Sequence, residues 1–146
     1  MKLYKLTEQD GTTQNGTYWD AGTIHTKLPK NNPQLCSSDV FHAYADVNLA
    51  FLLNPIHAAI ENPMLWECRG DVVVSDWGKV GCFQLTVKKQ MKIPTWVNSE
   101  HEQDIRILFA VLCAESVLSV FENQYPNDNR PRKAIEASKK YLQNKN

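Results

Sequence analysis

The stretch MLWECRGDVVVSDWGKVGCFQLTVKK, residues 64–89, decides the fold of this chain. Its two halves are rich in valine and aromatic residues, and the short sequence Ser75-Asp76-Trp77-Gly78 separates them. Valine and aromatic residues favour strands, and a polar segment with glycine between two such runs is typical of a hairpin turn. We therefore predict an antiparallel β-hairpin over residues 64–89.

The segments before this hairpin predict short strands and one inserted helix. KLYKLT at the start, two pieces of TYWDAGTIHTKL and the alternating sequence VFHAYA have strand character. Alternation in VFHAYA places His42 and Tyr44 on the same side. Asp46 then suits a helix N-cap, because its carboxylate can accept from exposed amides one turn on. The helix is expected near residues 46–61, where Pro55 should stop or kink it.

The chain after Pro94 predicts two helices. Ser99 and Glu102 fit a capping box, and apolar residues recur with helical period from Ile105 to Phe121. This long helix should run from about residue 99 to 123 and pack its apolar face on the sheet. RPRKAIEASKKYL predicts a final amphipathic helix on the outside, with Asp128 or Asn129 as its cap and Pro131 in its first turn. The expected fold class is α+β, in a single domain over 1–146 with a sheet-rich part (1–95) and a helical part (96–146).

Composition excludes some classes of function. The chain has 146 residues, with 16 basic and 16 acidic side chains and no net charge, so a dedicated nucleic-acid-binding protein is not expected. No stretch reaches the roughly 18 apolar residues that a membrane crossing requires, and the N-terminus lacks the apolar core of a signal peptide. We therefore expect a cytoplasmic protein whose four cysteines are reduced, buried thiols: Cys36, Cys68, Cys82 and Cys113.

Two resemblances to known families cover most of the chain. The elements LYKLT, FHAYADVNLAFLLNPIHA, NPMLWECRG and KVGCFQLTV resemble a family of small proteins found in bacteriophage and prophage genomes. The closing stretch LCAESVLSVFENQYPNDNRPRKAIEASKKYL resembles the helical pair of immunity proteins. The first resemblance implies a phage-associated setting, and neither resemblance implies a reaction.

One candidate ligand site combines His42, Tyr44, His57 and Glu67. A histidine, a tyrosine and a carboxylate can act as general acid, general base and orienting group. The alternative is structural: the histidines hydrogen-bond irregular backbone near the prolines. LYK, FHAYADVNLA and LWE also follow in an order similar to elements of ADP-ribosyltransferases, although Lys5 stands where an arginine or histidine is frequent in them and their paired glutamates are missing.

Other candidate chemistries have less support in the sequence. Histidines and cysteines do not occur in the two short-range pairs that structural zinc requires, so no metal and no cofactor are expected. No sequence motif supports a catalytic pair of Cys82 and His42.

The candidate binding surface consists of tryptophans and basic residues. Trp77 lies in the hairpin turn and Trp96 precedes the long helix, and exposed aromatic residues are typical anchors for partner proteins. Two basic clusters accompany them, around Lys88 and Lys89 and around Arg130 and Arg132. The alternative is that the tryptophans pack over the core edge and the basic residues form solvated surfaces.

Three functions remain open from the sequence. The first is a small phage or prophage protein that acts by binding a bacterial host protein, as an inhibitor of a bacterial defence system, and is not an enzyme. The second is a protein that binds an NAD-like nucleotide, or an ADP-ribosyltransferase-like enzyme, using residues around Tyr44. The third is a toxin-neutralising immunity protein, an interpretation that rests on the C-terminal helices alone. The sequence leaves open the target and the oligomeric state, a homo-oligomer included.

Overall fold

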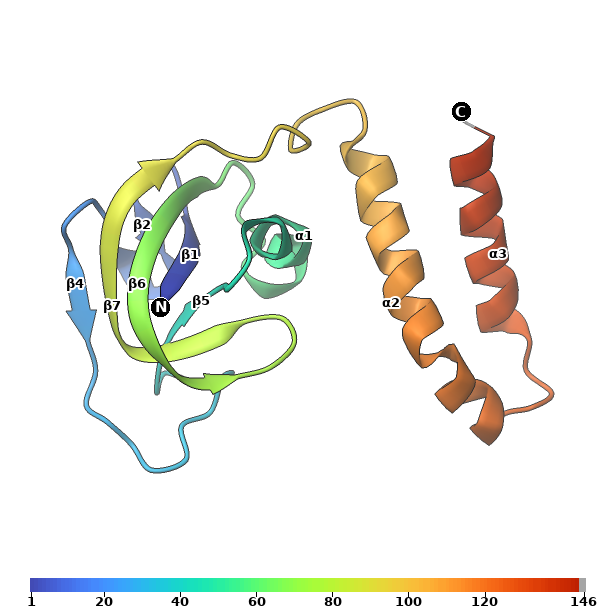
Figure 1. The fold of residues 1–146 in the computed structure, drawn as a ribbon, viewed down its shortest axis with the longest axis horizontal. Coiled ribbons are helices and arrows are strands. Elements are labelled where there is room, and N and C mark those ends of the chain that lie inside the picture. The colour runs from blue at the N-terminus through green and yellow to red at the C-terminus, as the bar shows by residue number, and fades with distance from the viewer. Residues whose placement is uncertain (145–146) are drawn as a thin grey trace. The chain divides into compact units, whose positions relative to one another are not determined.

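The computed structural model describes residues 1–144 and divides the chain into two compact units, residues 1–94 and residues 95–146. The first unit contains the strands and one helix, and the second contains two helices (Figure 1). The predicted α+β class is confirmed. The assignment of the whole chain to a single domain, with a sheet-rich part (1–95) and a helical part (96–146), stays a prediction.

The predicted hairpin is the centre of the sheet. β6 (Met64–Ser75) and β7 (Val80–Met91) pair antiparallel, from Leu65 opposite Met91 to Ser75 opposite Val80. The Asp76 carboxylate holds the turn by accepting the backbone N–H groups of Gly78 and Lys79, both at 2.7 Å. Three register shifts interrupt the ladder, and bulges of this kind bend a strand and increase its twist. Both strands are accordingly strongly curved (Figure 1).

Shorter strands complete the sheet around this hairpin. β1 (Lys2–Thr7) pairs with β6, while β4 (Ile24–Thr26) and β5 (Phe41–Ala43) both pair with β7. Tyr44 and Tyr4 exchange two backbone hydrogen bonds of 2.8 Å, which join the end of β5 to β1. The pairings β1–β6, β6–β7, β7–β5 and β5–β1 therefore close a ring. A separate small ladder joins β2 (Thr12–Thr13) and β3 (Thr17–Tyr18) across the 3-10 turn η1 (Gln14–Gly16).

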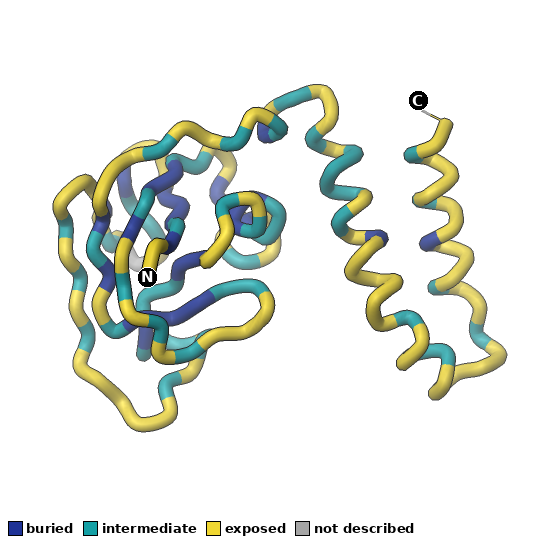
Figure 2. Tube along the Cα trace, in the orientation of Figure 1, coloured by how far each residue is buried: buried dark blue, intermediate teal, exposed yellow. Residues whose placement is uncertain are grey.

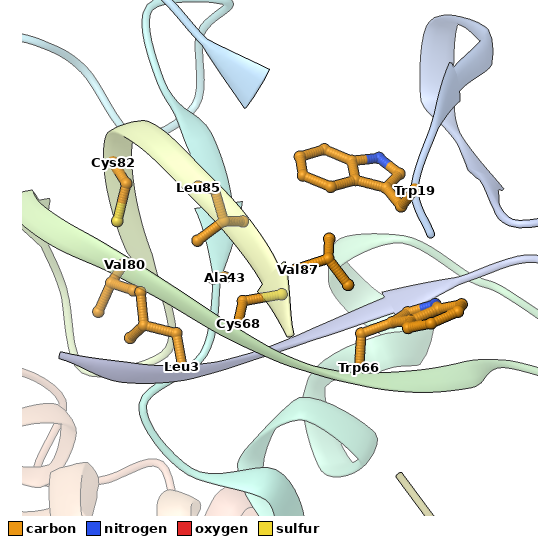
Figure 3. Packing of buried hydrophobic residues seen from close by; sticks show 9 residues of the cluster. All are labelled: Leu3, Trp19, Ala43, Trp66, Cys68, Val80, Cys82, Leu85 and Val87. Atoms are coloured by element: carbon orange, nitrogen blue, oxygen red, sulfur yellow. The ribbon is translucent and has the colours of Figure 1, made fainter. Parts of the chain in front are cut away.

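The core of the first unit lies among these strands (Figures 2 and 3). Its buried members are Leu3, Trp19, Ala43, Trp66, Cys68, Val80, Cys82, Leu85 and Val87. The Trp66 indole N–H is satisfied inside this core, because it donates to the Thr7 hydroxyl at 2.9 Å. Gly81 allows close packing, since a Cβ there would lie 2.6 Å from Val40 Cγ2.

The inserted helix α1 (Val47–His57) has the predicted cap but a different end. The Asp46 carboxylate accepts the Leu49 backbone N–H at 2.9 Å. Pro55 was expected to stop or kink the helix. It does not stop it, because α1 continues through Pro55 to His57. The buried Asn54 side chain holds this end: it donates to the Ile60 carbonyl at 2.7 Å and accepts the Ile60 N–H at 3.2 Å. These bonds fix the backbone beyond the proline.

The second unit consists of α2 (Glu102–Gln124) and α3 (Arg130–Gln143), which run antiparallel and pack on each other (Figure 1). The predicted capping box was wrong, since α2 begins at Glu102 and His101 occupies the N-cap without a side-chain bond. Ser99 instead donates to the Trp96 carbonyl, and the Glu102 carboxylate accepts the Asn98 N–H. Packing of α2 on the sheet stays a prediction.

Candidate functional site

A cavity of about 530 Å³ lies in the sheet unit beside the closed ring. Its wall combines β1, β5, the end of α1, the hairpin turn and the loops around β3 and β4. Three of the four predicted ligand-site residues line it: His42, Tyr44 and His57. The fourth, Glu67, is not part of this lining.

Tyr44 and His57 form a direct pair. The Tyr44 hydroxyl lies 3.1 Å from His57 Nδ1, and the two rings are nearly parallel at a centroid distance of 5.9 Å. Burial raises the pKa of Tyr44 to about 12 and lowers the pKa of His57. Both groups are therefore neutral at pH 7, and a neutral phenol can donate to an unprotonated imidazole nitrogen.

His42 has the structural contact that the alternative interpretation described. Its Nε2 is hydrogen-bonded to the backbone carbonyl of Leu35, in the irregular segment before β5. Burial lowers the pKa of His42, which again favours the neutral ring. A neutral ring that donates to a carbonyl braces the loop and leaves no free acid or base at Nε2.

Glu67 pairs with cations on the sheet instead of joining the histidines. Its carboxylate lies 3.2 Å from Lys2 Nζ and 3.9 Å from Lys89 Nζ. The carboxylate whose charge acts on Tyr44 and His57 is Asp76, in the hairpin turn. Bonds from the Lys79 and Gly78 amides lower the pKa of Asp76 and keep it ionised.

The strongest polar feature of the cavity, Lys5, was not among the predicted ligand residues. The Lys5 side chain is buried, its Nζ donates to the His42 carbonyl at 3.0 Å, and it lies 4.2 Å from the Trp19 ring centroid. Burial lowers its pKa to about 8. A signal was present in the sequence, because alternation places Lys5 between the inward-facing residues Leu3 and Thr7 of the strand KLYKLT.

Lys27 and Lys79 bring two more ammonium groups to the cavity wall. Lys27 Nζ donates to the Ser38 carbonyl at 2.5 Å and lies 4.7 Å from the Phe41 ring centroid. Lys79 Nζ lies 3.5 Å from Cys36 Sγ. Both lysines lie outside regular strands, where sequence periodicity gives no indication of direction.

The cysteines do not match the expectation of four buried thiols. Cys68 and Cys82 are buried, whereas Cys36 and Cys113 are exposed, and all four are free. Burial raises the pKa of Cys68 to about 12 and also raises that of Cys82, which makes both poor nucleophiles at pH 7. Within residues 1–144, no three His, Cys, Asp or Glu side chains are grouped closely enough to hold a metal ion.

The predicted binding tryptophans differ in exposure. Trp77 is fully exposed at the tip of the β6–β7 hairpin, with a relative accessibility of 101%. Trp96 is half-buried in the helical unit, where the Arg106 guanidinium lies 5.6 Å from its ring centroid. Of these two tryptophans, Trp77 therefore exposes its whole ring to a partner, and Trp96 exposes only part of its ring.

The predicted basic residues are distributed over both units. Lys88 and Lys89 are exposed on β7. In the helical unit, Arg130 pairs with Asp128 and Arg132 pairs with Glu122, both at 2.7 Å. These partners reduce the positive charge that the two arginines present to another molecule.

Comparison with known proteins gives one result, for the helical unit. Residues 97–146 match the family described as Imm-5 like putative immunity protein, which is about a third of the chain. A search of curated proteins and a search of solved structures each find no match. Among residues 1–144, none of the helices combines the length and apolar character needed to span a bilayer.

Proposed function

We propose that this chain is an immunity protein, which neutralises a toxin by binding it. The observation that carries the proposal is the family match over residues 97–146, which coincides with the compact helical unit 95–146. An immunity protein acts on a partner protein, so the helices should carry a surface suited to protein contact.

Helix α2 has such a surface. Val111 of α2 and Ile135 of α3 are buried where the two helices pack, and the ion pair Arg132–Glu122 joins the same two helices. Other large apolar side chains of α2 stay exposed: Leu108, Leu112, Val117 and Val120. Leu108 and Leu112 are four residues apart and so lie on the same face of α2, and exposed apolar side chains grouped in this way are typical of protein–protein contact sites.

The contact with the toxin should therefore centre on α2. A carboxylate placed among these apolar side chains would lose its hydration in the complex without a partner, which strongly disfavours binding. The interpretation of the chain as a phage-encoded inhibitor of a bacterial defence system stays a prediction, and the exposed Trp77 is the feature of the sheet unit that suits it.

The test is neutralisation of a toxin encoded beside this chain. Cells that express the toxin should recover growth when they also express the chain, and the two purified proteins should elute as a complex in size-exclusion chromatography. Leu112→Glu and Val120→Glu should abolish both effects while the circular dichroism spectrum is kept. Ala137→Glu adds the same charge at an exposed position of α3 and should leave both effects intact. Failure of the unaltered chain to bind or neutralise the toxin would contradict the proposal.

A further inference from the structure

The cavity of the sheet unit concentrates positive charge in a chain that has no net charge. Lys5, Lys27 and Lys79 line it, and among its described lining residues Glu8 alone is acidic. The two lining histidines, His42 and His57, have lowered pKa values and add no charge at pH 7. Three positive charges thus meet one negative charge in the lining, and the Asp76 carboxylate, whose charge acts on the lining residues Tyr44 and His57, is a second negative charge nearby.

Each of the three ammonium groups has N–H donors that its described contacts do not use. The bonds of Lys5 and Lys27 go to backbone carbonyls, and the contact of Lys79 is with a thiol. In the described part of the chain, none of the three forms an ion pair with a carboxylate. An ammonium group has three N–H donors, so each lysine can still donate to an anion in the cavity.

The size and lining of the cavity suit a small molecule with an apolar part. Sites for small molecules commonly measure about 300–1,000 Å³ and combine apolar walls with a few charged groups. The space of about 530 Å³ lies within this range, and Val40, Phe41 and Ile60 supply apolar wall. We propose that the cavity binds a small organic phosphate of mononucleotide size, whose phosphate contacts Lys5, Lys27 and Lys79 and whose organic part contacts this apolar wall.

This proposal goes beyond the proposed immunity function, and its test needs no toxin. Phosphate is the anion favoured by the arrangement, because several ammonium groups from separate segments can each bond a different phosphate oxygen. The pKa of Lys5, at about 8, still leaves it mostly charged at pH 7. Binding should therefore weaken as the pH rises above 8.

The chain contains an internal reporter and an internal control for this site. Cys36 lines the cavity and is exposed, while Cys113 is exposed on α2. Alkylation of each thiol by iodoacetamide can be followed in the same sample by peptide mass spectrometry. The probes are adenosine monophosphate, ribose 5-phosphate and inorganic phosphate, with adenosine as the uncharged counterpart.

A phosphate ester should slow alkylation of Cys36 about fivefold or more near saturation and raise the Tm by several degrees, because it binds the folded state alone. Alkylation of Cys113 should not change, and adenosine should have no effect. Titration calorimetry should show a loss of affinity of about tenfold for Lys79→Gln and for Lys27→Gln, since each removes a charged donor. Lys88→Gln makes the same change of charge outside the cavity and should bind with unchanged affinity.

Three results would overturn the proposal. The first is that no phosphate ester protects Cys36 or raises the Tm. The second is that Lys79→Gln and Lys27→Gln bind as tightly as Lys88→Gln, which would place the ligand elsewhere. The third is that inorganic phosphate binds as tightly as the esters, which would leave no role for the apolar wall.

Discussion

The hydroxyl of Tyr44, just after β5, lies 3.1 Å from Nδ1 of His57, the last residue of α1. This bond connects the sheet to the end of the inserted helix across 13 residues of chain. The ring of Tyr44 is mostly buried, whereas His57 is only half-buried. The pair therefore contributes to stability, and water can reach the imidazole if the phenol oxygen is removed.

Tyr44→Phe should lower the free energy of unfolding by about 1 kcal/mol, the usual net contribution of one hydrogen bond whose partner can be hydrated. Urea denaturation at pH 7 measures this change. Tyr18→Phe removes the hydroxyl of an exposed tyrosine and should change stability by less than half as much. Equal effects of the two substitutions would show that the Tyr44–His57 bond has no specific contribution.

Mild acid should destabilise the protein through His42 and His57. Burial lowers the pKa of both histidines from 6.5, so between the lowered pKa values and 6.5 the unfolded chain binds more protons than the folded one. The unfolding free energy should thus fall as the pH drops through about 6.5 towards 5. Urea denaturation across this range should show a smaller fall for the double variant His42→Gln, His57→Gln. His101→Gln, at an exposed position, should behave like the unaltered protein.

Mild alkali should have the opposite effect through Lys5. The pKa of Lys5 is lowered from 10.5 to about 8, so between pH 8 and 10.5 the unfolded chain binds more protons and stability rises with pH. The rise from pH 7 to 9 should be about 1 kcal/mol. Above pH 9 the buried thiol of Cys68 opposes this rise in stability. Its pKa is raised from 9.0 to about 12, so the thiol loses its proton in the unfolded chain at a lower pH than in the folded protein. Stability should therefore stop rising between pH 9 and 10 in urea denaturation, and Lys5→Met should lack the rise between pH 7 and 9.

The elements of the fold that were predictable from the sequence have a local cause. The β6–β7 hairpin follows from valine-rich runs around a glycine-containing turn, and the start of α1 follows from the Asp46 cap. The end of α1 was not predictable in this way. It depends on the Asn54 side chain bonding Ile60 six residues later, a contact that outweighs the local effect of Pro55.

The candidate site was predictable only in part, for a similar reason. Strand alternation placed His42 and Tyr44 near each other, but the position of Glu67 depended on its neighbours in β6. Trp66 and Cys68 on either side of Glu67 are buried, which directs Glu67 outward to Lys2 and Lys89. Lys27 and Lys79 reach the cavity from positions outside regular strands, and only the paired sheet brings such positions together.

The buried bond between Trp66 and Thr7 makes a sharper prediction for the core. Trp66 Nε1 donates to Thr7 Oγ1 at 2.9 Å, and the two side chains join β6 to β1. Thr7→Val keeps the shape and volume of the side chain but leaves the indole N–H without an acceptor inside the core. An unsatisfied buried donor costs about 1–3 kcal/mol, so the unfolding free energy should fall by that amount.

The control for this substitution is Thr26→Val, which makes the same chemical change at an exposed position of β4. It should leave stability within about 0.5 kcal/mol, because valine favours strands as much as threonine and no buried group loses a partner. Hydrogen exchange of the Trp66 indole, followed by NMR, gives a second measurement. Its N–H should exchange faster in Thr7→Val than in Thr26→Val. If Thr7→Val were as stable as Thr26→Val and the indole exchanged no faster, the hydroxyl of Thr7 would not be the acceptor that holds Trp66.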